Sequence, residues 1–222
     1  MSGVRVLGLT GSVASGKSFV AALFDLLGIP VFDADATVHA LLAPGGLAVA
    51  PVLAAFPETA DAAGGIDRRR LGARVFHEPA ALARLERILH PLVREAERRF
   101  LARCARHRIW LAVLDIPLLF ETGAEARVDR TVVVSCHPLL QEQRALARPG
   151  MSRERLARVR AHQWPDAEKV KRADYVIRTG RGRGEALAAV RAIVRDMRDC
   201  PTRAFPDRWL LGARRERPRR AA

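Results

Sequence analysis

The stretch Gly11–Ser18, with the sequence GSVASGKS, most constrains the fold of this chain. It fits the pattern G-x-x-x-x-G-K-[ST], follows a short apolar run and opens a segment with helical spacing. In this strand, loop and helix context, backbone N–H groups of the loop and of the first helical turn point at phosphate oxygens. The sequence therefore predicts a nucleotide-binding loop with contacts from Ser12, Val13, Ala14, Ser15, Gly16, Lys17, Ser18 and Phe19.

Two side chains of this loop are expected to carry specific chemistry. Lys17 should reach the β- and γ-phosphates, where it stabilises charge on the group being transferred. The Ser18 hydroxyl should ligate Mg²⁺. The alternative is a flexible Gly/Ser loop, but the full pattern is uncommon by chance in a chain of 222 residues. Lys17 is also one of only three lysines in the chain, so the loop is predicted to bind phosphate.

Short apolar runs recur along the chain, each bounded by turn or charged residues and separated from the next by helical segments. This is the βαβ pattern of a buried parallel sheet. We therefore predict an α/β fold of P-loop NTPase type, a parallel sheet flanked by helices, with strands at residues 4–9, 29–32, 109–114, 130–135 and 174–177.

Two segments without strand patterns interrupt this core. Residues 41–103 show the apolar spacing of helices, interrupted at Pro79 and Pro91, and are predicted to form a helical insertion. Residues 137–164 are rich in arginine, break at RPGMS with Ser152 as a helix N-cap, and are predicted to form a lid. The nucleotide-binding core then comprises residues 1–40, 104–136 and 165–199, followed by a basic, flexible tail at 200–222.

Composition narrows the class of protein. Hydrophobic residues make up 49% of the chain and charged residues 28%, which is the balance of a folded globular protein. No apolar run is long enough to span a membrane, and the one near the N-terminus is too short for a secretory leader. Cys104, Cys136 and Cys200 have no zinc-ligand spacing and are odd in number, so we expect a reducing cytoplasm rather than disulfides.

The chain is strongly basic, with a formal net charge of +14. Such a charge suits a nucleic-acid-binding protein or a site for polyanionic small molecules. Part of the excess lies in the tail, which we predict to be a frayed end rather than a binding arm. Aromatic residues are only 5%, and no helix-turn-helix or RNA-binding signature is present. A nucleic-acid-binding protein with a vestigial nucleotide site is therefore the less favoured alternative.

Aspartates stand at the C-terminal ends of three regions predicted to be strands, at the edge of an open α/β sheet where ligands bind. Phosphoryl transfer needs a carboxylate near the Mg²⁺ and a group that orients or deprotonates the acceptor hydroxyl. We assign Asp33 to catalysis and Asp115 to the metal or to a structural role. For Asp35, a helix N-cap is an equally good interpretation.

Two arginines of the predicted lid, Arg144 and Arg148, are four residues apart, which would place both on one helix face. Like charges at that spacing repel by roughly 0.2 to 0.5 kcal/mol unless a negative ligand neutralises them. Bound ATP would do so, because guanidinium groups recognise phosphate oxygens and stabilise charge during transfer. We therefore predict that both bind ATP and that Arg144 takes part in catalysis. A solvated basic face is the alternative.

Several stretches together resemble one family, the dephospho-coenzyme A kinases. They occur in the family's order and span nearly all of the chain before the tail. The loop is shared by many NTPases, whereas the combination of Asp-Ala-Asp, Asp-Arg-x-x-Leu, Leu-His-Pro and Pro-Leu-Leu-Phe-Glu is highly specific. The stretches are GLTGSVASGKS (8–18), VFDAD (31–35), GGIDRRRLGARVF (64–76), LERILHPLV (85–93), DIPLLFE (115–121), QEQRALAR (141–148), Gln163 and ADYVI (173–177).

The resemblance implies transfer of the γ-phosphoryl group of ATP, with Mg²⁺, to the ribose 3′-hydroxyl of dephospho-coenzyme A, the last step of coenzyme A synthesis. It implies that the helical insertion carries the acceptor site and that the segment with Arg144 and Arg148 covers ATP. Asp33 would hold or deprotonate the acceptor hydroxyl. Arg68 and His90 lie in family motifs and would contact the acceptor or hold the insertion closed; their structural alternatives are an ion pair and a helix cap.

The chain departs from the family's pattern in the loop and near the base. The family commonly has glycine where this chain has Ser12 and Ala14, and threonine where it has Phe19. Because Ser12 and Ala14 add side chains, we expect both to have φ below zero. The family's asparagine near the adenine is absent, since the chain contains no asparagine. The base is therefore expected to be read by backbone groups or by Thr179.

Other P-loop proteins are the nearest rivals. A regulatory GTPase needs the asparagine of its guanine-binding motif, which this chain lacks. Another small-molecule kinase, acting on a nucleoside or nucleotide, shares the architecture and is the main alternative. As partners we expect ATP and dephospho-coenzyme A, neither a membrane nor a nucleic acid, and a monomer or weak homo-oligomer.

Overall fold

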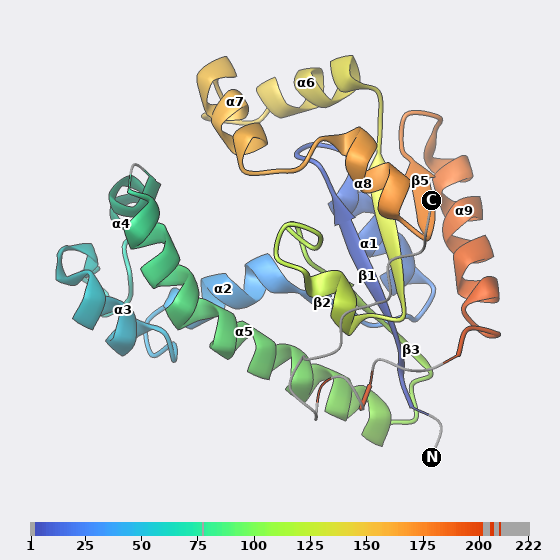
Figure 1. Ribbon diagram of the computed structural model, residues 1–222, viewed down its shortest axis with the longest axis horizontal. Helices are drawn as coiled ribbons and strands as arrows, with labels where there is room; N and C mark the ends of the chain where they lie inside the picture. Colours follow the sequence, from blue (N-terminus) through green and yellow to red (C-terminus); the bar gives the residue numbers. More distant parts are fainter. Residues whose placement is uncertain (1–2, 77, 202–204, 207–208, 210–222) are drawn as a thin grey trace. The chain divides into compact units, whose positions relative to one another are not determined.

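The chain forms a five-stranded sheet with the strand order β2-β3-β1-β4-β5 (Figure 1). The computed structural model describes residues 3–76, 78–201, 205–206 and 209. Strand β1 pairs in parallel with β3 and β4, and β4 pairs in parallel with β5. Each strand lies on one of the predicted apolar runs, so the predicted α/β fold is confirmed. The strands are β1 (Arg5–Gly11), β2 (Val31–Asp33), β3 (Leu111–Asp115), β4 (Arg130–Ser135) and β5 (Tyr175–Arg178).

The chain divides into two compact units. The sheet unit comprises the described residues of Met1–Phe32 and Leu101–Ala222, and the helical unit comprises Asp33–Phe100. Residues 33–40, which were predicted to lie in the nucleotide-binding core, belong to the helical unit. The reason is helix α2 (Ala34–Leu42), whose C-terminal leucines are buried in the apolar cluster of that unit.

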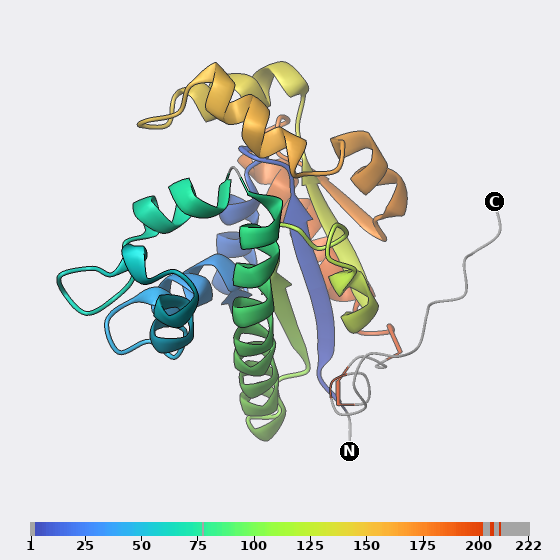
Figure 2. The same cartoon turned by 60° about the vertical axis from the view of Figure 1, so that its left-hand side comes forward.

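In the sheet unit, apolar side chains of β1 and β4 meet those of α1 (Lys17–Leu26) and α9 (Arg183–Asp196) in one buried cluster. This cluster fixes the first helix, and with it the loop between β1 and α1. Helix α6 (Pro138–Leu146) follows β4, and Figure 2 shows it beside α7 (Arg153–Ala161) beyond the end of that strand. Helix α8 (Asp166–Arg172) then leads to β5, and a short 3₁₀ helix spans Ala124–Arg127.

The helical unit is built around a second apolar cluster, which includes Leu42, Phe56, Leu71 and Leu89. Its elements after α2 are α3 (Val49–Ala55), a 3₁₀ turn (Pro57–Thr59), α4 (Arg68–Phe76) and the part of α5 (Pro79–Arg106) that ends at Phe100. The apolar positions along these helices recur every three or four residues, so each helix can bury one face in the cluster.

Helix α5 continues through Pro91, although the sequence analysis predicted an interruption there. A proline inside a helix removes one backbone hydrogen bond and crowds the preceding turn. Leu89 is buried in the apolar cluster, with Leu92 and Val93 packed against it, on both sides of the proline. Packing of this face holds the helix together across the proline, so the predicted interruption at Pro91 is wrong.

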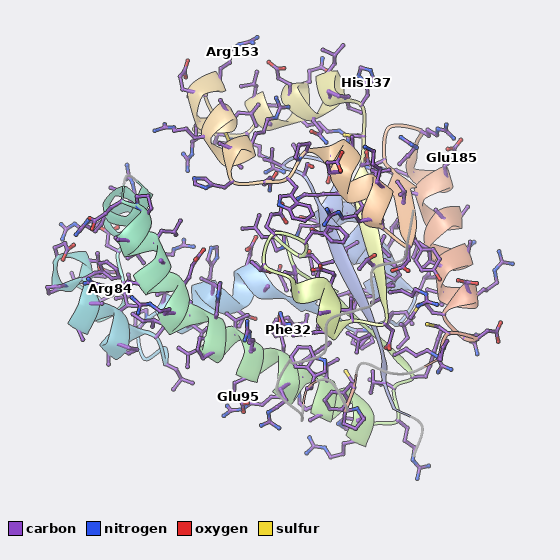
Figure 3. The ribbon with its side chains drawn as sticks, viewed as in Figure 1. Phe32, Arg84, Glu95, His137, Arg153 and Glu185 are labelled. Carbon is purple, nitrogen blue, oxygen red and sulfur yellow. The ribbon has the colours of Figure 1, made fainter. Side chains whose placement is uncertain are left out.

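The lid segment contains α6 and α7, and Figure 3 labels His137 and Arg153 at their starts. Ser152 caps α7, because its side chain accepts a hydrogen bond from Arg155 N at 3.2 Å, as predicted. No helix in the described ranges is long and apolar enough to cross a membrane. The prediction of a flexible tail at residues 200–222 falls largely outside the described residues.

Candidate active site

The loop between β1 and α1, called the P-loop below, depends on two glycines. A Cβ on Gly11 would lie 2.6 Å from Ser15 Oγ and from the Val134 carbonyl oxygen, so no side chain fits there. Gly16 has φ 95°, and a Cβ on it would lie 3.0 Å from Thr179 Oγ1. Glycine is the residue that adopts positive φ without steric conflict. Both glycines of the pattern are therefore required by the local geometry.

Ala14 lies in the left-handed region, with φ 59°, so the expectation of a negative φ is wrong at this position. A non-glycine residue there is strained by roughly 1–2 kcal/mol, because Cβ approaches the following carbonyl oxygen. The Ala14 methyl is buried against Ala145 and Leu156 of the lid helices, a contact that glycine could not make. Ser12 does not have positive φ, as expected.

Lys17 and Asp115 form a close ion pair. Residue Leu9 of β1 pairs with Asp115 at the end of β3, so the carboxylate lies at the sheet edge where the P-loop begins. The Lys17 Nζ lies 2.5 Å from Asp115 Oδ1, and the Asp115 side chain is only 5% exposed. Ser18 follows in the first turn of α1 and is exposed. The predicted lysine and the two predicted metal ligands are thus attached to neighbouring elements of the sheet unit.

Two P-loop groups that the sequence assigned to the nucleotide are engaged within the protein. Ser12 Oγ donates a hydrogen bond to Asp166 Oδ1 at 2.9 Å, and Val13 N donates to Gln163 Oε1 at 3.0 Å. Asp166 also accepts from Ser135 Oγ at 2.5 Å. Gln163 is part of the family resemblance, whereas Asp166 was not predicted, because the sequence shows it only as an acidic residue at the start of a short helix.

Thr179 joins the lid to the P-loop. Its hydroxyl donates to the Ser15 carbonyl oxygen at 2.6 Å and accepts from Arg144 Nη1 at 3.0 Å. Arg144 Nη2 also donates to the Thr179 carbonyl oxygen at 3.3 Å. A hydroxyl has one proton to donate, and Thr179 uses it for the loop. Thr179 therefore links lid and loop in this structure.

Arg148 lies outside the helix on which it was predicted. Helix α6 ends at Leu146 with Ala147 as its C-cap, and Arg148 is exposed in the turn that follows. The turn forms because Gly150, with φ 72°, reverses the chain before α7 begins. The placement of Arg144 and Arg148 on one helix face is therefore wrong, although both belong to the lid segment.

Phe19 and Cys136 flank the site without the features of catalytic residues. The ring of Phe19 packs against the apolar cluster of the sheet unit, and the Arg183 guanidinium lies 6.0 Å from its centroid. Burial raises the pKa of the Cys136 thiol, which lies close to Arg144 and Thr179. Cys136 therefore has no lowered pKa of the kind that activates a cysteine nucleophile.

The remaining predicted residues belong to the helical unit. Asp33 ends β2 and is the N-cap of α2, because its Oδ1 accepts a hydrogen bond from Ala36 N at 2.9 Å. Asp35 lies in the first turn of that helix, so it is not the cap. Arg68 is the first residue of α4 and is exposed. His90 lies inside α5 and is exposed, so its interpretation as a helix cap is wrong.

A buried ion pair next to the site was not predicted at all. Lys169 of α8 is completely buried, and its Nζ lies 2.8 Å from Glu121 Oε1. The same oxygen accepts a hydrogen bond from Trp164 N at 2.8 Å. Trp164 stacks on Phe120, with ring centroids 6.2 Å apart, and the Arg172 guanidinium lies 4.3 Å from the Trp164 centroid. The one sequence feature that could have indicated this ion pair is that Lys169 is a lysine in an arginine-rich chain.

Comparison with known proteins decides the family. The family model described as dephospho-CoA kinase matches residues 5–183. The chain belongs to the dephospho-CoA kinase family. A dephospho-CoA kinase of Rhodospirillum rubrum is 52% identical over 213 residues, which cover 96% of this chain and 99% of that protein. A dephospho-CoA kinase of Rhizobium meliloti is 50% identical and covers 87% of this chain and 98% of its own length.

Solved structures share the fold of this chain. A crystal structure of a Thermus thermophilus protein that is 36% identical has a TM-score of 0.75, over 87% of this chain and 98% of that one. A dephospho-CoA kinase from Campylobacter jejuni, 23% identical, has the same fold with a TM-score of 0.58, over 87% of this chain and 97% of its own. The site of this dephospho-CoA kinase family member thus combines a P-loop with a lysine and aspartate pair at the edge of its sheet.

Proposed function

We propose that this protein transfers the γ-phosphoryl group of ATP to the ribose 3′-hydroxyl of dephospho-coenzyme A, giving coenzyme A and ADP in the last step of coenzyme A synthesis. The observation that carries the proposal is the P-loop with Lys17 and Asp115 beside it, in a chain whose family model matches residues 5–183. The names of relatives that are 52% and 50% identical support the choice of acceptor.

The P-loop is the proposed site of the ATP phosphates. Backbone N–H groups from Gly16 to Ser18 and the positive end of the α1 dipole would surround them, whereas Ser15 N donates within the loop to the Ser12 carbonyl oxygen at 3.0 Å. In this structure Lys17 Nζ contacts Asp115, so binding would exchange that contact for one with the γ-phosphate. The exchange keeps the ammonium group next to negative charge throughout, and it places a positive charge where the transition state needs it.

Mg²⁺ fits the oxygen donors beside Lys17. An exposed serine hydroxyl in the first turn of α1 and a buried carboxylate at the end of β3 are the kind of ligands that Mg²⁺ takes together with phosphates and water. We therefore propose that Ser18 and Asp115 hold Mg²⁺. When bound, it neutralises charge on the β- and γ-phosphates.

The acceptor is proposed to bind through residues 41–103, with Arg68 and His90 as contacts. Asp33 is proposed as the group that takes the proton of the 3′-hydroxyl, because it ends a strand of the parallel sheet and carboxyl ends of such strands are where ligands bind. Residues 137–164 are proposed to cover ATP, with Arg144 and Arg148 on the phosphates. Since Thr179 is engaged, backbone groups are proposed to read the adenine.

An acceptor panel tests the reaction. Dephospho-coenzyme A should give ADP far faster than nucleosides or nucleoside monophosphates do, and the product should carry its new phosphate on the ribose 3′-oxygen. Release of ADP can be followed in a coupled assay, and the product can be identified by mass spectrometry and phosphorus NMR. Equal rates with nucleosides or nucleotides would replace the proposal by the alternative small-molecule kinase.

The role of Asp33 is tested with Asp33→Asn. Asparagine is as good an N-cap as aspartate, so helix α2 should be kept. It cannot accept the hydroxyl proton, so turnover should fall by about 10²- to 10⁴-fold while ATP affinity stays. Asp35→Asn, in the same helix turn, is the matched control and should be nearly as active as the parent. Undiminished turnover of Asp33→Asn would remove Asp33 from this role.

We further propose that the protein works in the cytoplasm as a monomer or weak homo-oligomer. Its three cysteines are buried and unpaired, as is usual for proteins of a reducing compartment. Oxidising conditions should therefore leave the mass of the chain and its mobility on a non-reducing gel unchanged.

A further inference from the structure

The P-loop is held from outside by residues 163–169, called the clasp segment below. We propose that Gln163 and Asp166 of this segment are positioning residues, which hold loop residues Ser12 and Val13 so that the next N–H groups of the loop face the nucleotide. The inference rests on the proposed nucleotide site and is independent of the acceptor.

Asp166 connects two elements through its two carboxylate oxygens. Oδ1 accepts from Ser12 Oγ at 2.9 Å, and Oδ2 accepts from Ser135 Oγ at 2.5 Å. Ser12 and Ser135 are 9% and 3% exposed, so water has little access to either. Hydrogen bonds to an ionised carboxylate are stronger than neutral ones. Removal of the carboxylate would leave two buried hydroxyls without this partner, so the position of the loop depends on Asp166.

Gln163 holds the next residue of the loop. Its Oε1 accepts from Val13 N at 3.0 Å, so consecutive loop residues are fixed by one short stretch of chain. Further along, the Ser15 carbonyl oxygen accepts from Thr179 at 2.6 Å. The loop is thus held on both sides of Ala14, the residue with strained φ. Such contacts offset the strain and keep the backbone donors preorganised.

The clasp segment can hold the loop because it is itself anchored. Glu121 Oε1 contacts both the buried Lys169 Nζ and Trp164 N, each at 2.8 Å. Trp164 also stacks on the Phe120 ring, and the Arg172 guanidinium lies over the Trp164 ring. These contacts lie on both sides of Asp166 in the chain. A displacement of Asp166 would therefore have to break a buried ion pair or an aromatic stack.

A loop held in its binding conformation needs no ordering when a nucleotide arrives. Without the clasp contacts, only a fraction of molecules would have a competent loop, and the apparent Kd and KM for ATP would rise by the reciprocal of that fraction. Bound nucleotide would select the competent loop again, so kcat should change little. A group that touched the transferring phosphate would instead lower kcat. A positioning residue therefore changes KM, whereas a residue that contacts the transferring phosphate changes kcat.

The experiment replaces Asp166 and measures nucleotide binding directly, without the acceptor. In Asp166→Ala, the Kd of ADP by calorimetry and the KM of ATP should rise by about 3- to 30-fold, with kcat within about twofold of the parent. Asp166→Asn should show a smaller rise, because its amide can accept from one serine and donate to the other. Glu168→Ala, two residues further along α8, is the matched control, since Glu168 pairs with the exposed Lys171 and should leave Kd unchanged.

A double-mutant cycle tests whether Asp166 acts through the loop. If it does, Ser12→Ala should raise the nucleotide Kd, and the Ser12→Ala/Asp166→Ala variant should bind no more weakly than Asp166→Ala alone. Should Asp166→Ala fail to fold, Ser12→Ala carries the same test. An unchanged Kd in the folded variants, even with a lowered Tm, or additive losses in the cycle, would overturn the inference. Because binding is measured without acceptor, failure of the acceptor panel would leave this result standing.

Discussion

The P-loop of the sheet unit and the core of the helical unit are held by different kinds of contact. Around the P-loop of the sheet unit, functional groups are positioned by polar side chains that are largely buried, as in the pair of Lys17 with Asp115 and the link from Arg144 to Thr179. In the helical unit, the buried cluster around Phe56 is apolar. The ion pair between Glu95 and Arg98 of that unit lies at its surface.

Because of this difference, we expect substitutions in the apolar cluster to change stability and substitutions of the polar contacts to change activity. Exposed ion pairs contribute about 0–1 kcal/mol each, so the helical unit depends on its apolar cluster for most of its stability. The polar contacts of the sheet unit hold groups in place for chemistry, and their loss should be seen first in binding and turnover. The substitutions below test this division, in the order of their expected effect.

The largest effect on stability is expected for Phe56→Ala in the helical unit. Phe56 is 2% exposed, and a Phe to Ala change in a core lowers the free energy of unfolding by about 3–5 kcal/mol. Hydrogen exchange of the amides in α2 to α5 measures this loss. Leu47→Ala is the control in the same unit, because Leu47 is 66% exposed and its loss should matter little. Equal destabilisation by both variants would contradict an apolar cluster as the source of stability.

Lys17→Ala should have the next largest effect, on turnover. It removes a positive charge that stabilises the transferring phosphate, so kcat should fall by about 10²- to 10³-fold, with a smaller change in ATP affinity. Stopped-flow and equilibrium binding measurements separate the two. Lys171→Ala is the matched control, because Lys171 is 70% exposed and pairs with Glu168. Weaker ATP affinity with unchanged kcat would instead assign Lys17 to binding alone.

The smallest effect is expected for Ala14→Gly, which tests the apolar contact between P-loop and lid. Glycine relieves about 1–2 kcal/mol of strain at φ 59°, but it loses a buried methyl worth about 0.8 kcal/mol and gains freedom in the unfolded chain. The contributions nearly cancel, so the free energy of unfolding by urea should change by less than about 1 kcal/mol.

A second variant at the same position, and the size of the loss in Ala14→Gly, separate the strain from the methyl contact. Ala14→Val should destabilise by about 1–3 kcal/mol, because a branched side chain neither adopts positive φ readily nor fits the buried site. A loss of more than about 2 kcal/mol in Ala14→Gly would mean that the methyl contact outweighs the strain. The lid would then be held to the loop mainly by apolar packing.

Features with a local cause could be predicted from the sequence. The strands follow from short apolar runs bounded by turn residues, and the P-loop follows from Gly16 and Lys17 at the start of a helix. Ser152 as the cap of α7 follows from its place before an amphipathic stretch. Each depends on residues within a few positions of one another. The sequence by itself therefore determined the strands, the order of helices and strands along the chain, and the place of the phosphate loop.

The tertiary structure decided which partner each polar group has. Ser12 meets Asp166, which is 154 positions away, and Ser15 meets Thr179, which is 164 positions away. Ala14, which lies between these two contacts, has φ 59°, and helix α5 crosses Pro91 where its apolar face is packed. No local pattern encodes such contacts, because they arise only when the strands bring distant loops to one edge of the sheet. Hence the sequence located the phosphate loop, and only the fold showed how it is held.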